Sequence, residues 1–160
     1  MALRISKACL IGLVGLWGLI GGIQNLTQIS VGYDSVATVF SPTDVAGLAD
    51  WQSIQTPLIL WIAWAVIPLS KFFGSVFCFL GARSMLQARS LDADTFNRSK
   101  SLALVGCSIM LAMLFGGFIV AAETYFQLWQ TELGDFALPM AFRYIGCIAL
   151  IAIFVQQSDH

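Results

Sequence analysis

One lysine lies deep inside the longest apolar run of the chain. Lys71 stands near the middle of residues 57–82, about a dozen residues from the polar residues at either end. An α-helix rises about 1.5 Å per residue, which puts Lys71 about 18 Å from Arg83 and near the middle of a hydrocarbon layer about 30 Å thick. No Asp or Glu of the chain is expected at that depth. A cation there is costly and is therefore a candidate site by default.

Two interpretations of Lys71 stay open. In the first, its side chain extends toward a polar edge, or stays neutral among backbone carbonyls and the hydroxyl of Ser70 or Ser75. In the second, its ammonium binds an acidic residue of another protein, or the carboxylate or head group of a ligand.

A second group of polar residues follows the third apolar run. Counted from a turn predicted at Gly134, Arg143 and Glu123 lie on antiparallel helices at depths that differ by about 4 Å, within reach of an arginine side chain. We expect them to form an ion pair, because each charge alone near hydrocarbon is costly. The pair either clamps the two helices together or lines a polar pocket with Gln127 and Gln130.

Several kinds of chemistry are excluded by the residue types. The only histidine, His160, is the last residue, which argues against haem ligation by two histidines and against a histidine metal site. The four cysteines are spread over four apolar runs without a CxxC motif: Cys9, Cys78, Cys107 and Cys147. The net charge of −1 does not favour nucleic acid as a partner. We therefore expect no enzymatic activity, no metal and no cofactor.

The composition indicates that lipid surrounds much of the chain. Of its 160 residues, 58% are hydrophobic and 11% are charged, and the mean hydropathy is +0.82; a soluble domain carries about 25% charged residues. Four runs are long enough to cross a bilayer as helices. We predict an all-α, integral membrane four-helix bundle that forms a single transmembrane domain over residues 1–160, with spans at 8–29, 57–82, 101–122 and 137–155.

The charges predict how the chain is threaded. Lysine and arginine residues precede the first span and occupy the hairpin 83–100, whereas segments 30–56 and 123–136 contain only acidic charges. The positive-inside rule then places both termini and the 83–100 hairpin in the cytoplasm. The larger outer loop, residues 30–56, is predicted to hold a short helix that starts at "SPTD" (41–44).

Two helix boundaries are predicted from capping signals. Because no breaker interrupts "AAETYFQLWQTEL" before Gly134, we expect the third helix to continue past the membrane and end there. Asp135 is then expected to cap the fourth helix.

Glycines form one face of the first span. Gly15, Gly18 and Gly22 fall within about 60° of each other at 100° per residue, and small residues four apart let another helix approach closely. This face either packs within the chain or is a docking face for another subunit or a second copy.

Two stretches resemble a known family. "YFQLWQTELGDFALPMAFRY" (125–144) and the tail "FVQQSD" (154–159) are similar to the uncharacterised bacterial proteins known as predicted small integral membrane proteins, and "ARSLDADTFNRSKSLALVGC" (88–107) is similar more loosely. The resemblance covers nearly the whole chain. It implies a bacterial inner-membrane location and implies no activity or functional residue.

Two functions from different classes follow. The leading prediction is a non-enzymatic accessory or interaction subunit of a membrane protein assembly. The alternative is a small carrier or binder of an apolar or anionic ligand such as a lipid, quinone or fatty acid, held between the helices at Lys71 or at Arg143 and Glu123. A pocket that reaches Lys71 favours the alternative, and tight packing around Lys71 argues against it.

Overall fold

All regular structure in the described part of the chain is helical, as predicted. The computed structural model describes residues 1–42, 45 and 50–159. Four helical stretches are long and apolar enough to cross a membrane. The elements are α1 (Ala2–Thr27), α2 (Ile29–Phe40), the short 3₁₀-helix η1 (Asp50–Gln52), α3 (Pro57–Ala88), α4 (Ala93–Ser99), α5 (Ser101–Met113), its π-helical continuation η2 (Leu114–Tyr125), the 3₁₀-helix η3 (Leu128–Gln130) and α6 (Glu132–Gln156).

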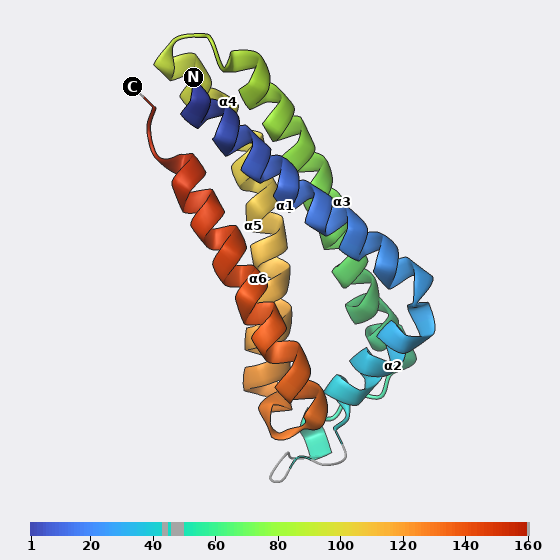
Figure 1. Cartoon of the computed structure of the whole chain (residues 1–160). Coiled ribbons are helices and arrows are strands. Elements are labelled where there is room, and N and C mark those ends of the chain that lie inside the picture. Colours follow the sequence, from blue (N-terminus) through green and yellow to red (C-terminus); the bar gives the residue numbers. More distant parts are fainter. Residues whose placement is uncertain (43–44, 46–49, 160) are drawn as a thin grey trace.

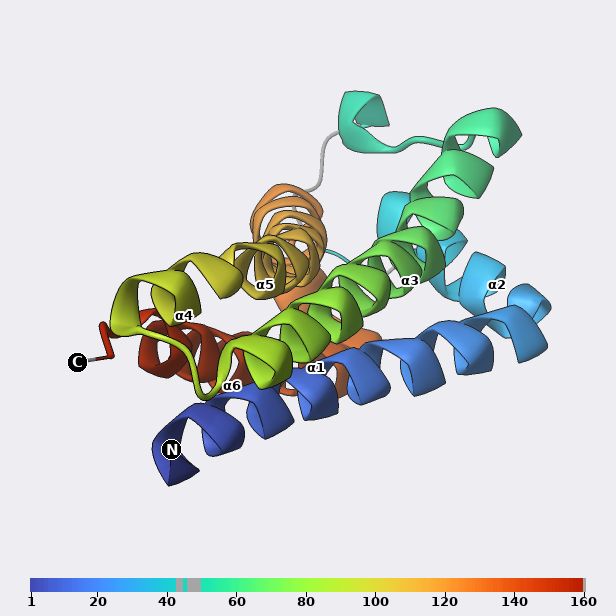
Figure 2. The ribbon, with the colours of Figure 1, turned by 90° about the horizontal axis from the view of Figure 1, so that it is seen from above.

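The helices converge at one end of the molecule and diverge toward the other. Both termini and α4 lie at one end, here called the termini end, and α2 lies at the opposite, or loop, end (Figure 1). Helices α1 and α3 run side by side, and α5 packs on α3 from the other side (Figures 1 and 2). Toward the loop end α2 and α3 separate from η2 and α6 (Figure 1).

The glycine face of α1 is buried against α3. A Cβ at Gly15 would lie 3.2 Å from Cys78 Cβ, and a Cβ at Gly22 would lie 3.0 Å from Phe72 Cζ. Gly18 likewise leaves no room for a methyl group, which would lie 2.5 Å from Ser75 Oγ. The close approach of these two helices therefore occurs within the chain.

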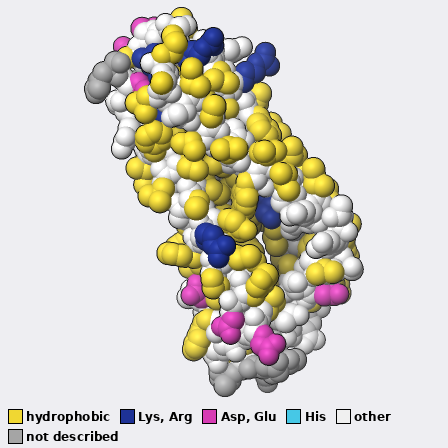
Figure 3. Space-filling model, viewed as in Figure 1, with side chains coloured by type: hydrophobic (Ala, Val, Ile, Leu, Met, Phe, Trp, Pro, Cys, Tyr) yellow, Lys and Arg dark blue, Asp and Glu magenta, His cyan; other side chains and the backbone are white. Residues whose placement is uncertain are grey.

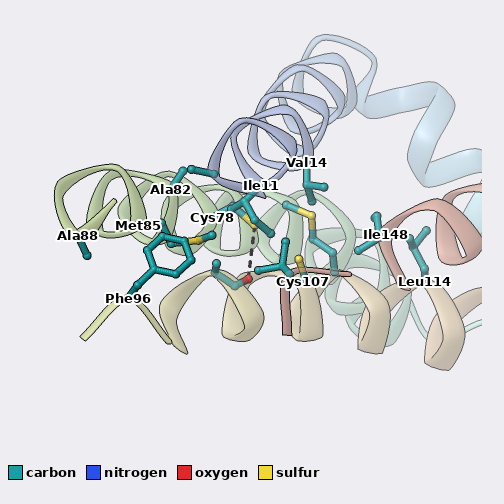
Figure 4. Close-up of a cluster of buried hydrophobic side chains, with 14 of the residues drawn as sticks. Ile11, Val14, Cys78, Ala82, Met85, Ala88, Phe96, Cys107, Leu114 and Ile148 are labelled. Atoms are coloured by element: carbon teal, nitrogen blue, oxygen red, sulfur yellow. Dashed lines mark hydrogen bonds between the residues drawn. The ribbon is translucent and has the colours of Figure 1, made fainter. Parts of the chain in front are cut away.

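The main hydrophobic core fills the termini half of the bundle. Figure 4 shows side chains from several helices turned toward one another there, with the thiol of Cys78 4.0 Å from the carbonyl of Ala103. Smaller clusters lie toward the loop end, one around Trp64 between α2 and α3 and one around Leu128 beside α6. The main core is made of Ala8, Ile11, Val14, Cys78, Ala82, Met85, Ala88, Phe96, Ala103, Cys107, Met110, Met113, Leu114, Ile148 and Val155.

The predicted boundary at Gly134 is wrong. The helical segment ends at Tyr125, and Gln127 adopts the left-handed conformation with φ 53°. Thr131 caps α6, because its hydroxyl accepts a hydrogen bond from the backbone N–H of Gly134 at 3.1 Å, so Asp135 is inside the first turn and is not the cap. A Cβ at Gly134 would overlap the carbonyl oxygen of Leu128, so glycine is needed there for close packing and not to end a helix.

The segment after the first span is more helical than predicted. Helix α2 begins at Ile29, immediately after a bend at Gln28, and occupies the first part of the predicted loop. The short helix predicted at 41–44 falls partly outside the described residues.

Candidate functional site

A cavity of about 460 Å³ lies between the two diverging groups of helices. Pockets that bind small molecules commonly measure about 300–1,000 Å³ and are mainly apolar. The lining residues come from the ends of α1 and α5, from α2, α3, η2 and η3, and from the start of α6: Asn25, Gly32, Ser35, Val36, Val39, Phe40, Ala63, Trp64, Val66, Ile67, Lys71, Ala112, Met113, Gly117, Phe118, Ala121, Ala122, Leu128, Leu133 and Ala137.

The cavity opens on the side of the bundle. Val66 and Gly117 line it and are also exposed, Val66 at 48%. A Cβ built at Gly117 meets nothing within 4 Å. In Figure 3 the surface between the two helix groups is hollowed within a largely apolar region. The cavity is therefore open on the side of the bundle, between two of its long apolar helical stretches.

Lys71 is the charged residue in this lining. It lies fourteen residues after the start of α3 at Pro57, about 21 Å along the helix and near the middle of the span. Its Nζ donates a hydrogen bond to Asn25 Oδ1 at 3.1 Å and lies 5.7 Å from the centre of the Trp17 ring, within the range of a cation–π contact. No ion pair with Lys71 occurs among the described residues.

The serines proposed as partners of Lys71 bind elsewhere. Ser75 Oγ donates to the backbone carbonyl of Lys71 at 2.6 Å, and Ser70 Oγ donates to the carbonyl of Ile67 at 2.9 Å. Neither hydroxyl therefore satisfies the ammonium. The partner that is present, Asn25, comes from α1 and could not be found from the local sequence around Lys71.

A second polar group in the cavity wall is unsatisfied. Trp64 lies one heptad before Lys71, so both side chains project from the same face of α3 about 10 Å apart along its axis. Trp64 is 8% exposed, and its Nε1 has no hydrogen-bond acceptor in the described part of the chain. Leaving such a donor buried costs about 1–3 kcal/mol.

Arg143 and Glu123 do not form the predicted ion pair, and neither lines the cavity. Because the turn falls at residues 126–131 and not at Gly134, Glu123 is two residues from the end of η2, while Arg143 is eleven residues into α6. Their depths therefore differ by about 13 Å at 1.5 Å per residue. Arg143 is exposed on the outer surface of α6, and Glu123 is half-buried.

Gln127 also lies outside the cavity. Its Oε1 accepts a hydrogen bond from Gln130 Nε2 at 2.6 Å, which closes the turn before α6. Of the four residues predicted to bind a ligand or partner, only Lys71 lines the cavity.

The sequence reasoning missed a buried ion network at the termini end. Lys7 Nζ and Lys100 Nζ lie 2.7 and 2.6 Å from the same carboxylate oxygen of Asp159, and both also donate to the carbonyl of Gln157. Asn97 accepts from Lys100 at 2.6 Å and from the Asp159 backbone N–H at 3.1 Å. The network ties the C-terminal tail to α1 and to the start of α5.

The charges of this network are almost fully covered. Lys7, Lys100 and Asp159 are 1%, 3% and 7% exposed. Burial by itself would raise the pKa of Asp159, but the hydrogen bonds from Lys100 and Lys7 outweigh it and hold that pKa below its ordinary value. Lys7 and Lys100 contributed to the prediction of threading as positive charges only, because nothing near them in the sequence identifies Asp159 as their partner.

Comparison with known proteins gives a family and no closer relative. The chain matches the family described as "Predicted small integral membrane protein (DUF2165)" over residues 3–158. No curated protein and no solved structure matches it. With four apolar helices and a match over nearly its full length, the chain belongs to this family of small integral membrane proteins.

Proposed function

We propose that this protein binds a small amphipathic molecule from the bilayer in the cavity between α2, α3, η2 and α6. The observation that carries the proposal is the cavity of about 460 Å³ that reaches Lys71. An intramembrane lysine without an acidic partner is costly in a purely structural role, and it becomes useful where a polar group of a ligand can reach it. The apolar remainder of the lining suits the tail of such a molecule.

The lateral opening supports binding from the membrane and not from water. An apolar tail gains little free energy on moving from lipid into an apolar cavity, because lipid chains are as apolar as the protein wall. Affinity must therefore come from the shape of the cavity and from the polar contact at Lys71.

Filling the cavity tests the proposal. Gly117→Leu places a side chain in the open space beside Gly117. The matched control is Gly116→Leu, because Gly116 also has open space around it but does not line the cavity. We expect native mass spectrometry of protein extracted in mild detergent to show a retained small molecule in the wild type and in Gly116→Leu, and its loss in Gly117→Leu. A wild type without such a molecule, or equal retention in both variants, contradicts the proposal.

A second candidate function is that of an accessory subunit, with a helix of the partner protein docked at the opening of the cavity. An acidic residue of a partner helix inserted at the lateral opening is the interaction that Lys71 offers, since the glycine face of α1 is occupied by α3. Purification from native membranes in mild detergent, followed by mass spectrometry, tests it. A stoichiometric second protein supports this role, and a monomer without partners argues against it.

We further propose a bacterial inner-membrane location with the termini end in the cytoplasm. The positive-inside rule supports this, because arginines gather at that end: Arg4, Arg83, Arg89 and Arg98. Labelling of single cysteines from each side of the membrane tests it, after replacement of the exposed Cys9 and Cys147. Labelling of segments 30–56 and 83–100 from the same side would contradict this orientation.

A further inference from the structure

We infer that the ligand is a single-chain monocarboxylate of the fatty-acid type, with its carboxylate at Lys71 and Asn25 and its chain extended toward the loop end. This inference rests on the proposed function and adds the chemical class of the ligand. Three features of the cavity carry it: the unpaired charge, the number of polar groups and the volume.

The charge favours an anion over a neutral head group. Among the described residues, no Asp or Glu lines the cavity, and Lys71 Nζ donates a hydrogen bond to a single amide oxygen. A quinone or an alcohol would offer an acceptor but would leave the positive charge uncompensated near the middle of the membrane. A carboxylate neutralises it.

The arrangement of donors suits two oxygens side by side. Asn25 Oδ1 already accepts from Lys71, and its Nδ2 donates to no acceptor in the described part of the chain. The ammonium of Lys71 has three N–H groups, of which one is used by Asn25. One carboxylate oxygen can therefore accept from Lys71 and the other from Asn25.

The volume limits the size of the ligand. At about 30 Å³ per non-hydrogen atom, the volume per molecule in liquid water, the cavity of about 460 Å³ holds about 15 such atoms. One carboxylate with a chain of about a dozen carbons fits this volume. A phospholipid with two acyl chains is several times larger and does not fit.

The position of Trp64 defines the direction of the chain. Trp64 lies about 10 Å from Lys71 along α3, toward the loop end, where the lining is apolar. An extended chain advances about 1.2 Å per bond, as a fully extended backbone does, so carbons 9 to 11 of the ligand reach the level of Trp64. A heavy atom on that part of the chain will therefore quench the fluorescence of Trp64.

The experiment uses the full chain in nanodiscs of zwitterionic lipid, with 11-bromoundecanoic acid as the probe and its methyl ester as the uncharged control. We expect saturable quenching by the acid, and less of it in Trp64→Phe, where neighbouring Trp61, 5.6 Å from Trp64 between ring centroids, still reports.

Lys71→Met removes the charge at similar length and should weaken the acid's affinity roughly 10- to 100-fold, as expected for a hydrogen bond to a charged group. Lys71→Arg keeps the charge and should stay within a few-fold of wild type, and the circular dichroism spectrum of each variant reports its folding.

The outcomes separate this inference from the function on which it rests. Equal quenching by acid and ester, abolished in both cases by Gly117→Leu, overturns the carboxylate and leaves the cavity as a ligand site. Acid binding that is unchanged in Lys71→Met overturns the inference in the same way. If neither probe gives saturable quenching, and Gly117→Leu does not change the retention of a small molecule in native mass spectrometry, the inference and the proposed function are overturned together.

Discussion

Removal of the Asp159 carboxylate is expected to destabilise the bundle far more than an ordinary change near a chain terminus. In Asp159→Ala the two ammonium groups of Lys7 and Lys100 lose the oxygen that they share at 2.7 and 2.6 Å. No other acidic residue pairs with either lysine in the described part of the chain. Two like charges then remain together in a site that water hardly reaches.

The magnitude follows from the burial of the partners. Removing one member of a buried ion pair costs about 3–5 kcal/mol, because the remaining charge stays desolvated and unpaired. The lysines are 1% and 3% exposed, which places them in that class and not among surface pairs worth about 0–1 kcal/mol. The site is at the end of the helices, where a small rearrangement admits water, so we expect the lower end, about 3 kcal/mol. Lys7→Met in the same chain removes the repulsion and should recover part of this loss.

Reversible unfolding in mixed micelles, followed by circular dichroism, measures the effect. Asp94→Ala is the matched control, since Asp94 is an exposed acid on nearby α4 without an ion pair. Its loss is expected to cost only a few tenths of a kcal/mol through the helix dipole. A loss below about 1 kcal/mol for Asp159→Ala, or one equal to the control, would refute the argument that this network is a buried and energetically coupled unit.

Two further predictions concern the tail and the packing of α3 on α5. The lysines hold the pKa of Asp159 below 3.8, its ordinary value, so the tail contact should contribute fully to stability above that pH and be lost only as the pH falls through the lowered pKa. Faster hydrogen exchange of the Asp159 amide should report the loss of this contact. Release of the tail already at pH 5 would contradict the prediction. Gly81→Ala should destabilise by at least about 1 kcal/mol, because its Cβ would lie 2.6 Å from the Cα of Ala103 and backbone must move. Gly12→Ala, where a Cβ meets nothing within 4 Å, should be neutral or stabilising in the same unfolding assay.

The helix boundaries show where reasoning from local signals fails. The turn before α6 contains neither glycine nor proline, and a glutamine adopts the left-handed conformation that usually marks glycine. Gly134, which looks like a helix end, lies where only glycine fits, because a Cβ there would overlap the backbone of Leu128. A turn at Gly134 would place Arg143 and Glu123 at similar depths. The observed turn at residues 126–131 places them at different depths, so the predicted ion pair does not form.

The sequence by itself determined the number of spans, the all-α class and the presence of a cation, Lys71, near the middle of the second span. These follow from composition along the chain, because a backbone in lipid must satisfy its own hydrogen bonds and a charge in an apolar run is visible without a structure. Only the tertiary structure decided which groups meet: Lys71 with Asn25, Lys7 with Asp159, and two diverging helix pairs that leave a cavity open to lipid. Those contacts join residues 46 to 152 positions apart, and they depend on rotations and separations of helices that apolar side chains specify only when they pack together.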